Sequence, residues 1–309
     1  MRNKKIGLLG YGIWGHNIHL SLNHLNAFVY VYDPDPGRIT KALQWGAEST
    51  THNFQQFLQL PVDAWIVASP STTHFSIIEE LTLLNLPIFV EKPLVTRIEE
   101  AQKLKNKNYS NIFVMHIWKY HPGIQMLADI AKSMNLGMVK GGKSVRVNWT
   151  SPRLDTDSLW NMAIHDLSIS ESLLGEIPPL QSVLPEIHNG NIRGLSVHLG
   201  HEPYYHFEVS NRYPDKRREV ILFCEEGVAV LRDEKVHHID IFEGNDKSSL
   251  SESSHYTVAF DPTPPLEIEL QVFLNYLKGG PPPPTDLDEA VRLIKALDSI
   301  EKLIFLKSE

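Results

Sequence analysis

The chain has 309 residues, of which 42% are hydrophobic and 21% are charged, and its formal net charge is −8 at pH 7. These values fit a globular protein with a substantial core, and the length favours two domains over one. Asp and Glu (37) outnumber Lys and Arg (29). This balance argues against nucleic acid or an anionic membrane as the main partner.

The only cysteine, Cys224, lies in an apolar run and is expected to be a buried structural thiol. A single cysteine excludes an intrachain disulfide and fits a reducing compartment. The basic N-terminal residues precede only a short apolar run, unlike a signal peptide. No apolar stretch approaches the roughly 20 residues that span a bilayer. We therefore expect a cytoplasmic protein.

A glycine-rich turn follows the first predicted strand, Ile6–Leu9. Its glycines are Gly10, Gly12 and Gly15, which have the G-x-G-x-x-G spacing, and a helix is predicted over residues 16–26. In a dinucleotide-binding fold, these glycines allow a tight turn, a close approach of a pyrophosphate, and close helix–strand packing. The free N–H groups of the helix N-terminus would then face the phosphates.

The second predicted strand, residues 27–32, ends at Asp33, where a dinucleotide fold places the acid that binds the adenosine ribose. Asp33 also begins a run of Asp, Pro and Gly that favours a turn, which is the alternative interpretation. Arg38 lies close behind and can meet a 2′-phosphate. With an acid at the strand end, the sequence favours NAD over NADP.

Strands and helices alternate through the first 118 residues. Further strands are predicted at 63–68, 87–90 and 112–115, and helices at 38–45, 53–60 and 73–84 and from Pro93 to Asn106. This alternation predicts an α/β Rossmann domain over residues 1–118, with a parallel sheet covered by helices on both faces.

The pattern changes in residues 119–309. Helices are predicted at 123–134, 161–174, 265–279 and 286–306, and strands at 138–149, 192–199, 204–211, 219–224, 227–231, 237–242 and 255–260. Turns are predicted at Asn189-Gly190 and at residues 213–215, and residues 281–284 form a proline-rich linker. The second domain is therefore predicted as α+β with a large, mainly antiparallel sheet.

The sequence resembles the Gfo/Idh/MocA oxidoreductases over essentially its whole length. The motifs that carry the resemblance are Gly10-Tyr11-Gly12-Ile13-Trp14-Gly15-His16-Asn17, Ala68-Ser69-Pro70 with His74, Glu91-Lys92-Pro93, Lys119-Tyr120-His121-Pro122-Gly123, Trp160-Asn161-Met162-Ala163-Ile164-His165-Asp166-Leu167, and Pro265-Leu266-Glu267 with Phe273. The glycine and Trp/His motifs look like those of members that act on sugars or nucleotide sugars.

The resemblance implies a Rossmann domain and a second domain whose open sheet forms the oligomer interface, hence a homodimer or homotetramer. The terminal helix can pack back on the first domain. The implied cofactor-binding residues are Gly10, Tyr11, Gly12, Ile13, Trp14, Gly15, Asp33, Arg38, Ser69, Pro70, His74, Glu91, Lys92 and Lys119.

Lys92 is the first candidate catalytic residue. It follows a parallel strand, at the edge of the sheet where ligands gather in such folds. Its ammonium can hydrogen-bond a substrate oxygen, and its surroundings can lower its pKa to a working value. The resemblance makes this lysine catalytic and Glu91 its orienting neighbour. A solvated strand end is the alternative.

His165 is the second candidate, and the resemblance places it near the reacting hydroxyl together with an acid four residues earlier. Positions i and i+4 share a helix face. This chain has Asn161 at the acid position, and an amide carries no negative charge and takes no proton. Either Lys92 and His165 suffice while Asn161 holds the substrate, or catalysis has been lost. Asp166 is expected to be structural.

Further substrate-binding candidates are Tyr120, Asn148 and Arg153, besides Lys92, Asn161 and His165; Tyr204 can line the same side. Arginine binds phosphate or carboxylate through two hydrogen bonds, which would suit a nucleotide-sugar diphosphate. Interdomain packing or surface ion pairs are the alternatives. The histidines lack metal-ligand spacing, so no metal is predicted.

The leading hypothesis is therefore an NAD(P)-dependent oxidoreductase, which transfers hydride between nicotinamide and a hydroxyl or keto carbon of a sugar, cyclitol or nucleotide sugar. A non-catalytic NAD-binding sensor or scaffold on the same fold is the second hypothesis, which Asn161 motivates. An imine or pyrrole reductase is the third, and the Lys92/His165 pair argues against it.

Overall fold

The computed structural model describes residues 3–150, 157–245 and 254–306. Contacts divide the chain into two compact units, residues 1–117 with 264–294 (the first unit) and residues 118–263 with 295–309 (the second unit). Residues 264–294 group with the first unit, and the domain boundary expected from the sequence stays a prediction.

A six-stranded parallel sheet forms the centre of the first unit, with strand order β3-β2-β1-β4-β5-β6. Its strands are β1 (Lys5–Leu9), β2 (Phe28–Tyr32), β3 (Ser49–Thr51), β4 (Ala64–Val67), β5 (Ile88–Glu91) and β6 (Ile112–Met115). The order reverses at β1, which creates the switch point at which doubly wound sheets bind ligands.

The helices of the first unit are α1 (Ile13–His24), α2 (Pro36–Gln44), α3 (Phe54–Leu58), α4 (His74–Thr82), α5 (Ile98–Asn106) and α8 (Pro265–Tyr276), together with the 3₁₀ turn Ser71–Thr73 and the start of α9 (Leu287–Leu306). Helix α8 packs against α1. Its Phe273 ring also lies 4.7 Å from the ring of Phe89 on β5. The C-terminal helices thereby complete the apolar core of this unit.

An eight-stranded sheet forms the second unit, in the order β14-β13-β12-β11-β7-β10-β9-β8. Its strands are β7 (Val139–Trp149), β8 (Leu180–His188), β9 (Asn191–Leu199), β10 (Tyr204–Ser210), β11 (Arg212–Cys224), β12 (Gly227–Leu231), β13 (His238–Glu243) and β14 (Ser254–Ala259). All neighbouring strands are antiparallel except β10 and β7. The mainly antiparallel second sheet and the parallel first sheet are both confirmed.

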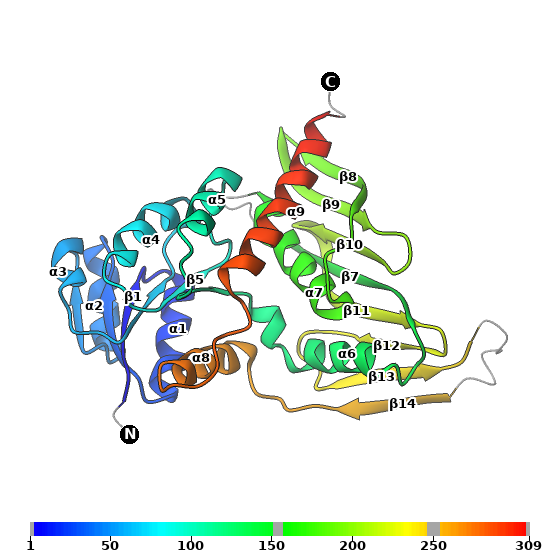
Figure 1. Cartoon of the computed structure of the whole chain (residues 1–309), viewed down its shortest axis with the longest axis horizontal. Helices are drawn as coiled ribbons and strands as arrows, with labels where there is room; N and C mark the ends of the chain where they lie inside the picture. Colours follow the sequence, from blue (N-terminus) through cyan, green and yellow to red (C-terminus); the bar gives the residue numbers. More distant parts are fainter. Residues whose placement is uncertain (1–2, 151–156, 246–253, 307–309) are drawn as a thin grey trace. The chain divides into compact units, whose positions relative to one another are not determined.

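Helices α6 (Pro122–Ser133) and α7 (Ile164–Leu174) cover one face of this sheet (Figure 1). A 3₁₀ segment, Ile117–Tyr120, precedes α6, and a π-helical turn, Leu159–Ala163, precedes α7. Side chains alternate along β7, so Ser144 and Arg146 face α7 while Lys143 points to the opposite face.

Three elements differ from the sequence-based expectations. Strands β3 and β8 were not predicted as separate strands. Strand β11 continues through residues 213–215, where a turn was expected. Pro214 is accommodated because the pairing of β11 with β7 is irregular between Arg212 and Arg217, and a bulge tolerates a residue without an N–H donor. Cys224 is half-buried, and burial raises the pKa of its thiol to about 11.

Candidate active site

Two glycines of the loop after β1 are required by the packing of the backbone itself. Gly10 has a φ of +94°, and a Cβ there would lie 2.6 Å from the carbonyl oxygen of Ala68. A Cβ on Gly15 would lie 2.1 Å from the carbonyl oxygen of Gly10. The loop, the start of α1 and the end of β4 therefore approach one another as closely as the backbone permits.

Gly12 differs, because a Cβ there would meet nothing within 4 Å. Within the described part of the chain, no side chain caps the N-terminus of α1, which follows Gly12. The next residue, Ile13, is 87% exposed. These features suit a dinucleotide. The open space at Gly12 and the first N–H groups of α1 fit a pyrophosphate, and the exposed Ile13 side chain fits the surface of a ring.

Asp33 lies at the end of β2 and is almost fully buried. Its Oδ2 accepts a hydrogen bond from the Tyr11 N–H at 2.7 Å, and its Oδ1 accepts one from the Asp35 N–H at 2.9 Å. The half-exposed Arg38 contacts both Asp33 (3.4 Å) and Asp35 (3.8 Å). A carboxylate has about four acceptor positions, so Asp33 can still accept a ribose hydroxyl.

The Tyr11 hydroxyl contacts two histidines of α1, His16 and His19. It is 2.8 Å from Nδ1 of His19 and 3.2 Å from Nδ1 of His16. Burial lowers the pKa of His19 to about 4, and the neighbouring His16 adds to this effect. Burial also raises the pKa of Tyr11 to about 12. These bonds fix the loop residue between Gly10 and Gly12 to the helix that follows.

Lys92 is half-buried directly after β5, and its backbone N–H donates to Glu91 Oε2 at 3.2 Å. The Trp14 indole N–H donates to the other Glu91 oxygen. His74, which is buried, places Nδ1 2.9 Å from the Pro93 carbonyl and Nε2 3.0 Å from the Ser69 carbonyl. Lys92 is therefore held between two neighbours that each connect to another predicted cofactor-binding segment.

In the second unit, Asn161 lies in the π-helical turn and His165 in the first turn of α7. Both residues are half-buried, and Nδ1 of His165 faces the interior. The Asn161 N–H donates to the Asp157 carbonyl at 3.0 Å. The spacing between Asn161 and His165 thus crosses from π-helix into α-helix, where a continuous α-helix was expected. Such π-helical turns often occur at functional sites.

Asp166 ties the start of α7 to the sheet. Its Oδ1 accepts a hydrogen bond from Ser144 Oγ at 2.7 Å, and its Oδ2 accepts one from Arg146 Nε at 2.8 Å. Asp166 is 1% and Arg146 5% exposed. The Arg146 guanidinium also lies 4.2 Å from the ring centre of Trp118. The expected structural role of Asp166 agrees with these contacts.

The three predicted residues after Trp118 also have partners in the second unit or are buried there. Lys119 Nζ lies 3.0 Å from Glu171 Oε2 on α7. Tyr120 is 2% exposed. His121 accepts a hydrogen bond from the Gly123 N–H at Nδ1, so its Nε2 carries the proton and donates to the Glu234 carbonyl. Burial lowers the pKa of His121, which favours this neutral form. Cofactor or substrate contacts for these residues stay predictions.

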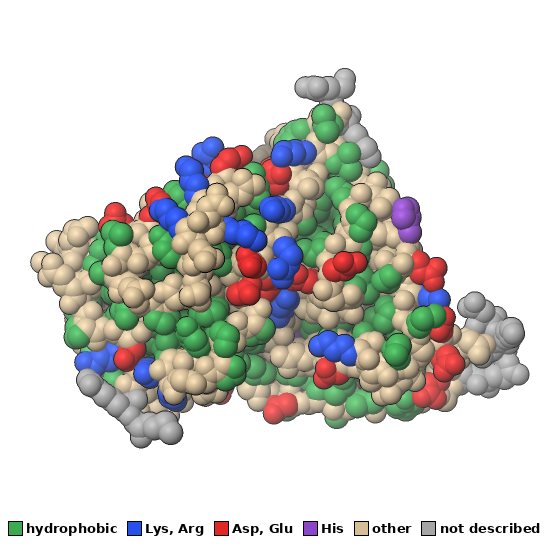
Figure 2. Space-filling view, in the orientation of Figure 1, with side chains coloured by type: hydrophobic (Ala, Val, Ile, Leu, Met, Phe, Trp, Pro, Cys, Tyr) green, Lys and Arg blue, Asp and Glu red, His purple; other side chains and the backbone are tan. Residues whose placement is uncertain are grey.

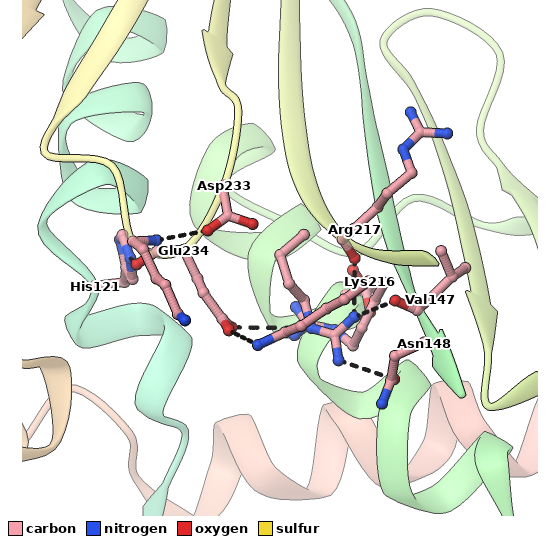
Figure 3. Close-up of polar contacts among 11 residues, drawn as sticks. His121, Val147, Asn148, Lys216, Arg217, Asp233 and Glu234 are labelled. Carbon is pink, nitrogen blue, oxygen red and sulfur yellow. Dashed lines mark hydrogen bonds and ion pairs between the residues drawn. The ribbon is translucent and has the colours of Figure 1, made fainter. Parts of the chain in front are cut away.

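Figure 3 shows Asn148 beside the cluster that includes His121, Lys216 and Glu234. Asn148 Oδ1 accepts a hydrogen bond from Arg218 at 3.0 Å. Tyr204 pairs with Gly141 and stacks on His198, on the face of the sheet that points away from α7. The suggestion that Tyr204 lines the same side as Asn148 is therefore wrong, because strand alternation turns it outward. Arg153 lies outside the described residues.

Sequence reasoning missed Trp118, Arg146, Arg218 and Glu234, and gave Asp166 no partner. A signal existed for one of them, because Ser144, Arg146 and Asn148 alternate along a strand that was itself predicted. Polar side chains with a period of two on a core-facing strand indicate a site or a buried network.

The side chains that are described contain no group of three or more His, Cys, Asp or Glu residues that could hold a metal ion. No helix among these residues is long and apolar enough to cross a membrane. In the view of Figure 2, acidic side chains are interspersed among the Lys and Arg side chains.

Residues 4–112 match the model of the Gfo/Idh/MocA oxidoreductase family, described as an NAD-binding Rossmann fold. Within these residues, the resemblance that the motifs indicated and the NAD-binding character of the fold are confirmed. The match covers the glycine loop, Asp33, His74 and the Lys92 turn.

Two curated relatives match this chain over about half of their own lengths. UDP-N-acetylglucosamine 3-dehydrogenase of Acidithiobacillus ferrooxidans is 27% identical over 184 residues, 58% of this chain and 56% of that protein. Inositol 2-dehydrogenase 2 of Paenarthrobacter aurescens is 28% identical over 184 residues, 55% of each chain. The chain therefore spans little more than half the length of these relatives.

Solved structures extend the similarity in fold to nearly the whole chain. A structure of the A. ferrooxidans enzyme has a TM-score of 0.83 at 19% identity and covers 98% of both chains. Levoglucosan dehydrogenase, in complex with NADH and levoglucosan, has a TM-score of 0.84 at 14% identity and covers 98% of this chain and 97% of its own. Both units therefore share the fold of these structures.

Proposed function

We propose that the chain is an NAD-dependent dehydrogenase or reductase that acts on a hydroxyl or keto carbon of a sugar, cyclitol or nucleotide sugar. The observation that carries the proposal is the turn around Lys92. Its neighbours connect to the glycine loop through Trp14 and to the Ser69 segment through His74. The candidate catalytic lysine is thus built into the cofactor-binding framework.

Lys92 is the proposed proton donor or acceptor for the reacting oxygen. Its half-buried position after a parallel strand suits an ammonium that must lose and regain a proton. Bound NAD would supply the hydride acceptor. The protein's part is to hold the sugar oxygen, orient it and move its proton, and general acid–base catalysis of this kind contributes roughly 10²–10⁴-fold in rate.

His165 is the proposed second polar group of the reaction, and Asn161 the proposed binder of a substrate hydroxyl. Asn161 offers both a donor and an acceptor and needs no charge for this role. The buried pair of Asp166 with Arg146 fixes the helix start from which His165 projects. The two relatives described above act on sugar-type substrates by name, which supports this substrate class.

NAD rather than NADP is the proposed cofactor. Asp33 and Asp35 both contact Arg38, the side chain nearest in sequence that could hold a 2′-phosphate. A phosphate would have to compete with two carboxylates for this guanidinium. Self-association through the face of the second sheet that carries Lys143, as a homodimer or homotetramer, and a cytoplasmic location complete the proposal.

The test is single-turnover reduction of NAD by the full-length protein over a panel of sugars, cyclitols and UDP-sugars. We expect turnover with at least one member and a loss of at least 100-fold in Lys92→Met. The matched control Lys107→Met changes an exposed lysine and should retain wild-type rates. Lys92→Met activity within twofold of wild type would refute the assignment of Lys92.

The non-catalytic alternative rests on Asn161 and has a different outcome in the same experiment. If the protein binds NADH but reduces no cofactor with any member of the panel, while Asn161→Asp gains turnover, the chain is a sensor or scaffold. Turnover by the wild-type protein excludes this alternative.

A further inference from the structure

Two arginines face each other on neighbouring strands of the second unit. Arg146 on β7 and Arg218 on β11 are direct cross-strand partners, so their side chains lie on the same face of the sheet. The side chains are only 7% and 12% exposed. Like charges directly opposite one another destabilise a sheet, and burial increases that cost. Retaining both charges therefore calls for a function or for compensating anions.

The contacts that orient the Arg146 guanidinium do not involve its terminal nitrogens, Nη1 and Nη2. Nε donates to Asp166, Ser144 holds the other Asp166 oxygen, and the Trp118 ring lies 4.2 Å from the guanidinium carbon. Among the described residues, none accepts a hydrogen bond from Nη1 or Nη2 of Arg146. The two terminal nitrogens thus form a rigid pair of N–H donors that donate to no described residue.

Arg218 is fixed in a comparable way. Its Nη1 donates to the carbonyls of Val147 and Arg217, each at 2.8 Å, and its Nη2 donates to Asn148 at 3.0 Å. Its Nε lies 3.9 Å from Glu234, which also pairs with Lys216. Burial, followed by the charge of Arg146, lowers the pKa of Arg218.

Each arginine has a carboxylate partner, but the Arg218–Glu234 pair is long, at 3.9 Å, compared with 2.8 Å between Arg146 and Asp166. Asp166 is the only carboxylate, within the described part of the chain, that accepts a hydrogen bond from either guanidinium. Asp233 lies nearby and its Oδ1 accepts the Lys235 N–H, while His121 is neutral and donates to a carbonyl. An oxyanion would relieve the repulsion between the arginines and fill the donors of Arg146.

We propose that Arg146, supported by Arg218, forms a subsite for an oxyanion, and that the substrate is a sugar bearing a carboxylate or a phosphate. The inference rests on the proposed function, since it names the substrate class of the same reaction. A planar guanidinium matches both anions through two parallel hydrogen bonds. Asp166 connects this subsite to the reaction, because it holds Arg146 and directly follows His165 in α7.

The first experiment compares matched pairs of substrates in NAD-dependent turnover by the full-length protein. The pairs are glucose with glucuronate, and N-acetylglucosamine with its 1-phosphate and its UDP conjugate. We expect at least 10-fold higher kcat/KM for an anionic member than for its neutral partner. A preference for glucuronate identifies the carboxylate as the anion, and a preference for the phosphate members identifies the phosphate.

The variant Arg146→Lys keeps the charge next to Asp166 but removes the fork. We expect it to raise KM for the preferred anionic substrate at least 10-fold and to lower the ratio of kcat/KM for the anionic substrate to kcat/KM for its neutral partner by the same factor. Arg217→Lys, on the exposed neighbouring residue of the same strand, is the control and should change neither value. Equal losses for neutral and anionic substrates in Arg146→Lys would overturn the proposal.

Calorimetric titration with inorganic pyrophosphate and with malonate tests the subsite without a reaction. Binding to the wild type that is weakened at least 10-fold in Arg146→Lys supports the subsite even if no sugar reacts, in which case only the proposed function fails. Absent or unchanged binding overturns the subsite. If Arg146→Lys does not fold, Arg218→Lys takes its place with the same expected loss.

Discussion

The glycine loop of the first unit and the arginine pair of the second unit are held in place by different parts of the chain. Close contacts between backbone atoms fix the loop, whereas contacts of long side chains fix the arginine pair. Gly10 and Gly15 fit against carbonyl oxygens with no room for a Cβ. Arg146 and Arg218 instead lie on strands β7 and β11. Their ion-pair partners, Asp166 and Glu234, come from other segments of the chain. The first region depends on local spacing, and the second on pairs of charges that must be buried together.

This difference predicts different kinds of failure. A substitution in the loop should act through steric overlap or through weaker cofactor binding. It should leave the ion pairs of the first unit unchanged. A change in the arginine pair should leave an uncompensated charge in a buried place, which costs more than a lost surface contact.

Asp166→Asn should destabilise the protein by about 3–5 kcal/mol, because removing one partner leaves the buried Arg146 charge without its counter-ion. Urea unfolding followed by circular dichroism measures the change. Glu202→Gln is the control: it breaks an exposed pair with Lys140, and such pairs contribute about 0–1 kcal/mol. Equal effects of the two variants would show that burial does not set the strength of the Asp166 contact.

His19 should make the first unit sensitive to acid. Its folded-state pKa of about 4 lies below the ordinary value, so its contribution to stability is complete above the unfolded-state pKa of about 6.5. As the pH falls from about 6.5 to about 4, the His19 imidazole binds a proton in the unfolded state but stays neutral in the folded state. Stability should therefore fall by about 1.4 kcal/mol per pH unit from this group.

The His19 contribution is isolated by comparing unfolding free energies of wild type and His19→Gln between pH 7 and pH 4.5. The variant should be less stable than wild type at pH 7, because it loses the Tyr11 contact, and the gap should narrow as the pH falls. His52→Gln, on an exposed histidine, should follow the wild-type curve. A gap that stays constant with pH would contradict the assigned protonation state.

Gly15→Ala and Gly12→Ala separate the two roles of glycine in the same loop. The Gly15 variant places Cβ against a backbone oxygen and should lose about 1–3 kcal/mol of stability, as overpacked sites do. The new methyl group of the Gly12 variant meets no atom of the described residues within 4 Å, so this variant should unfold at the wild-type temperature. Its NADH affinity, measured by fluorescence titration, should nevertheless fall at least 10-fold.

Unchanged NADH affinity in Gly12→Ala would show that the open approach to Gly12 is not where the cofactor binds. Loss of stability in that variant would equally contradict the geometry, since the structure offers no atom for the new methyl group to strike.

The contrast between the regions also explains what could be predicted from the sequence. Strand–helix alternation gave the parallel sheet, but β3 has only three residues and carries no recognisable pattern. Motifs with fixed spacing gave Gly12, Asp33 and Lys92. Arg218 and Glu234 lie 72 and 88 residues beyond Arg146 in the chain, and their meeting depends on strand order and register, which local patterns do not encode.

Asp33→Asn tests the cofactor preference and should have the smallest effect. The amide retains an acceptor for the Tyr11 N–H but loses the charge that faces Arg38. We expect NADH to bind about 10-fold more weakly, or about 1.4 kcal/mol, and NADPH to bind more tightly, because Arg38 becomes available to a 2′-phosphate. Asp63→Asn, at the start of β4 and far along the chain from the loop, is the control. Tighter binding of NADPH than NADH by the wild-type protein would contradict the preference, and with it the idea that a buried carboxylate at the end of β2 decides which cofactor enters the glycine loop.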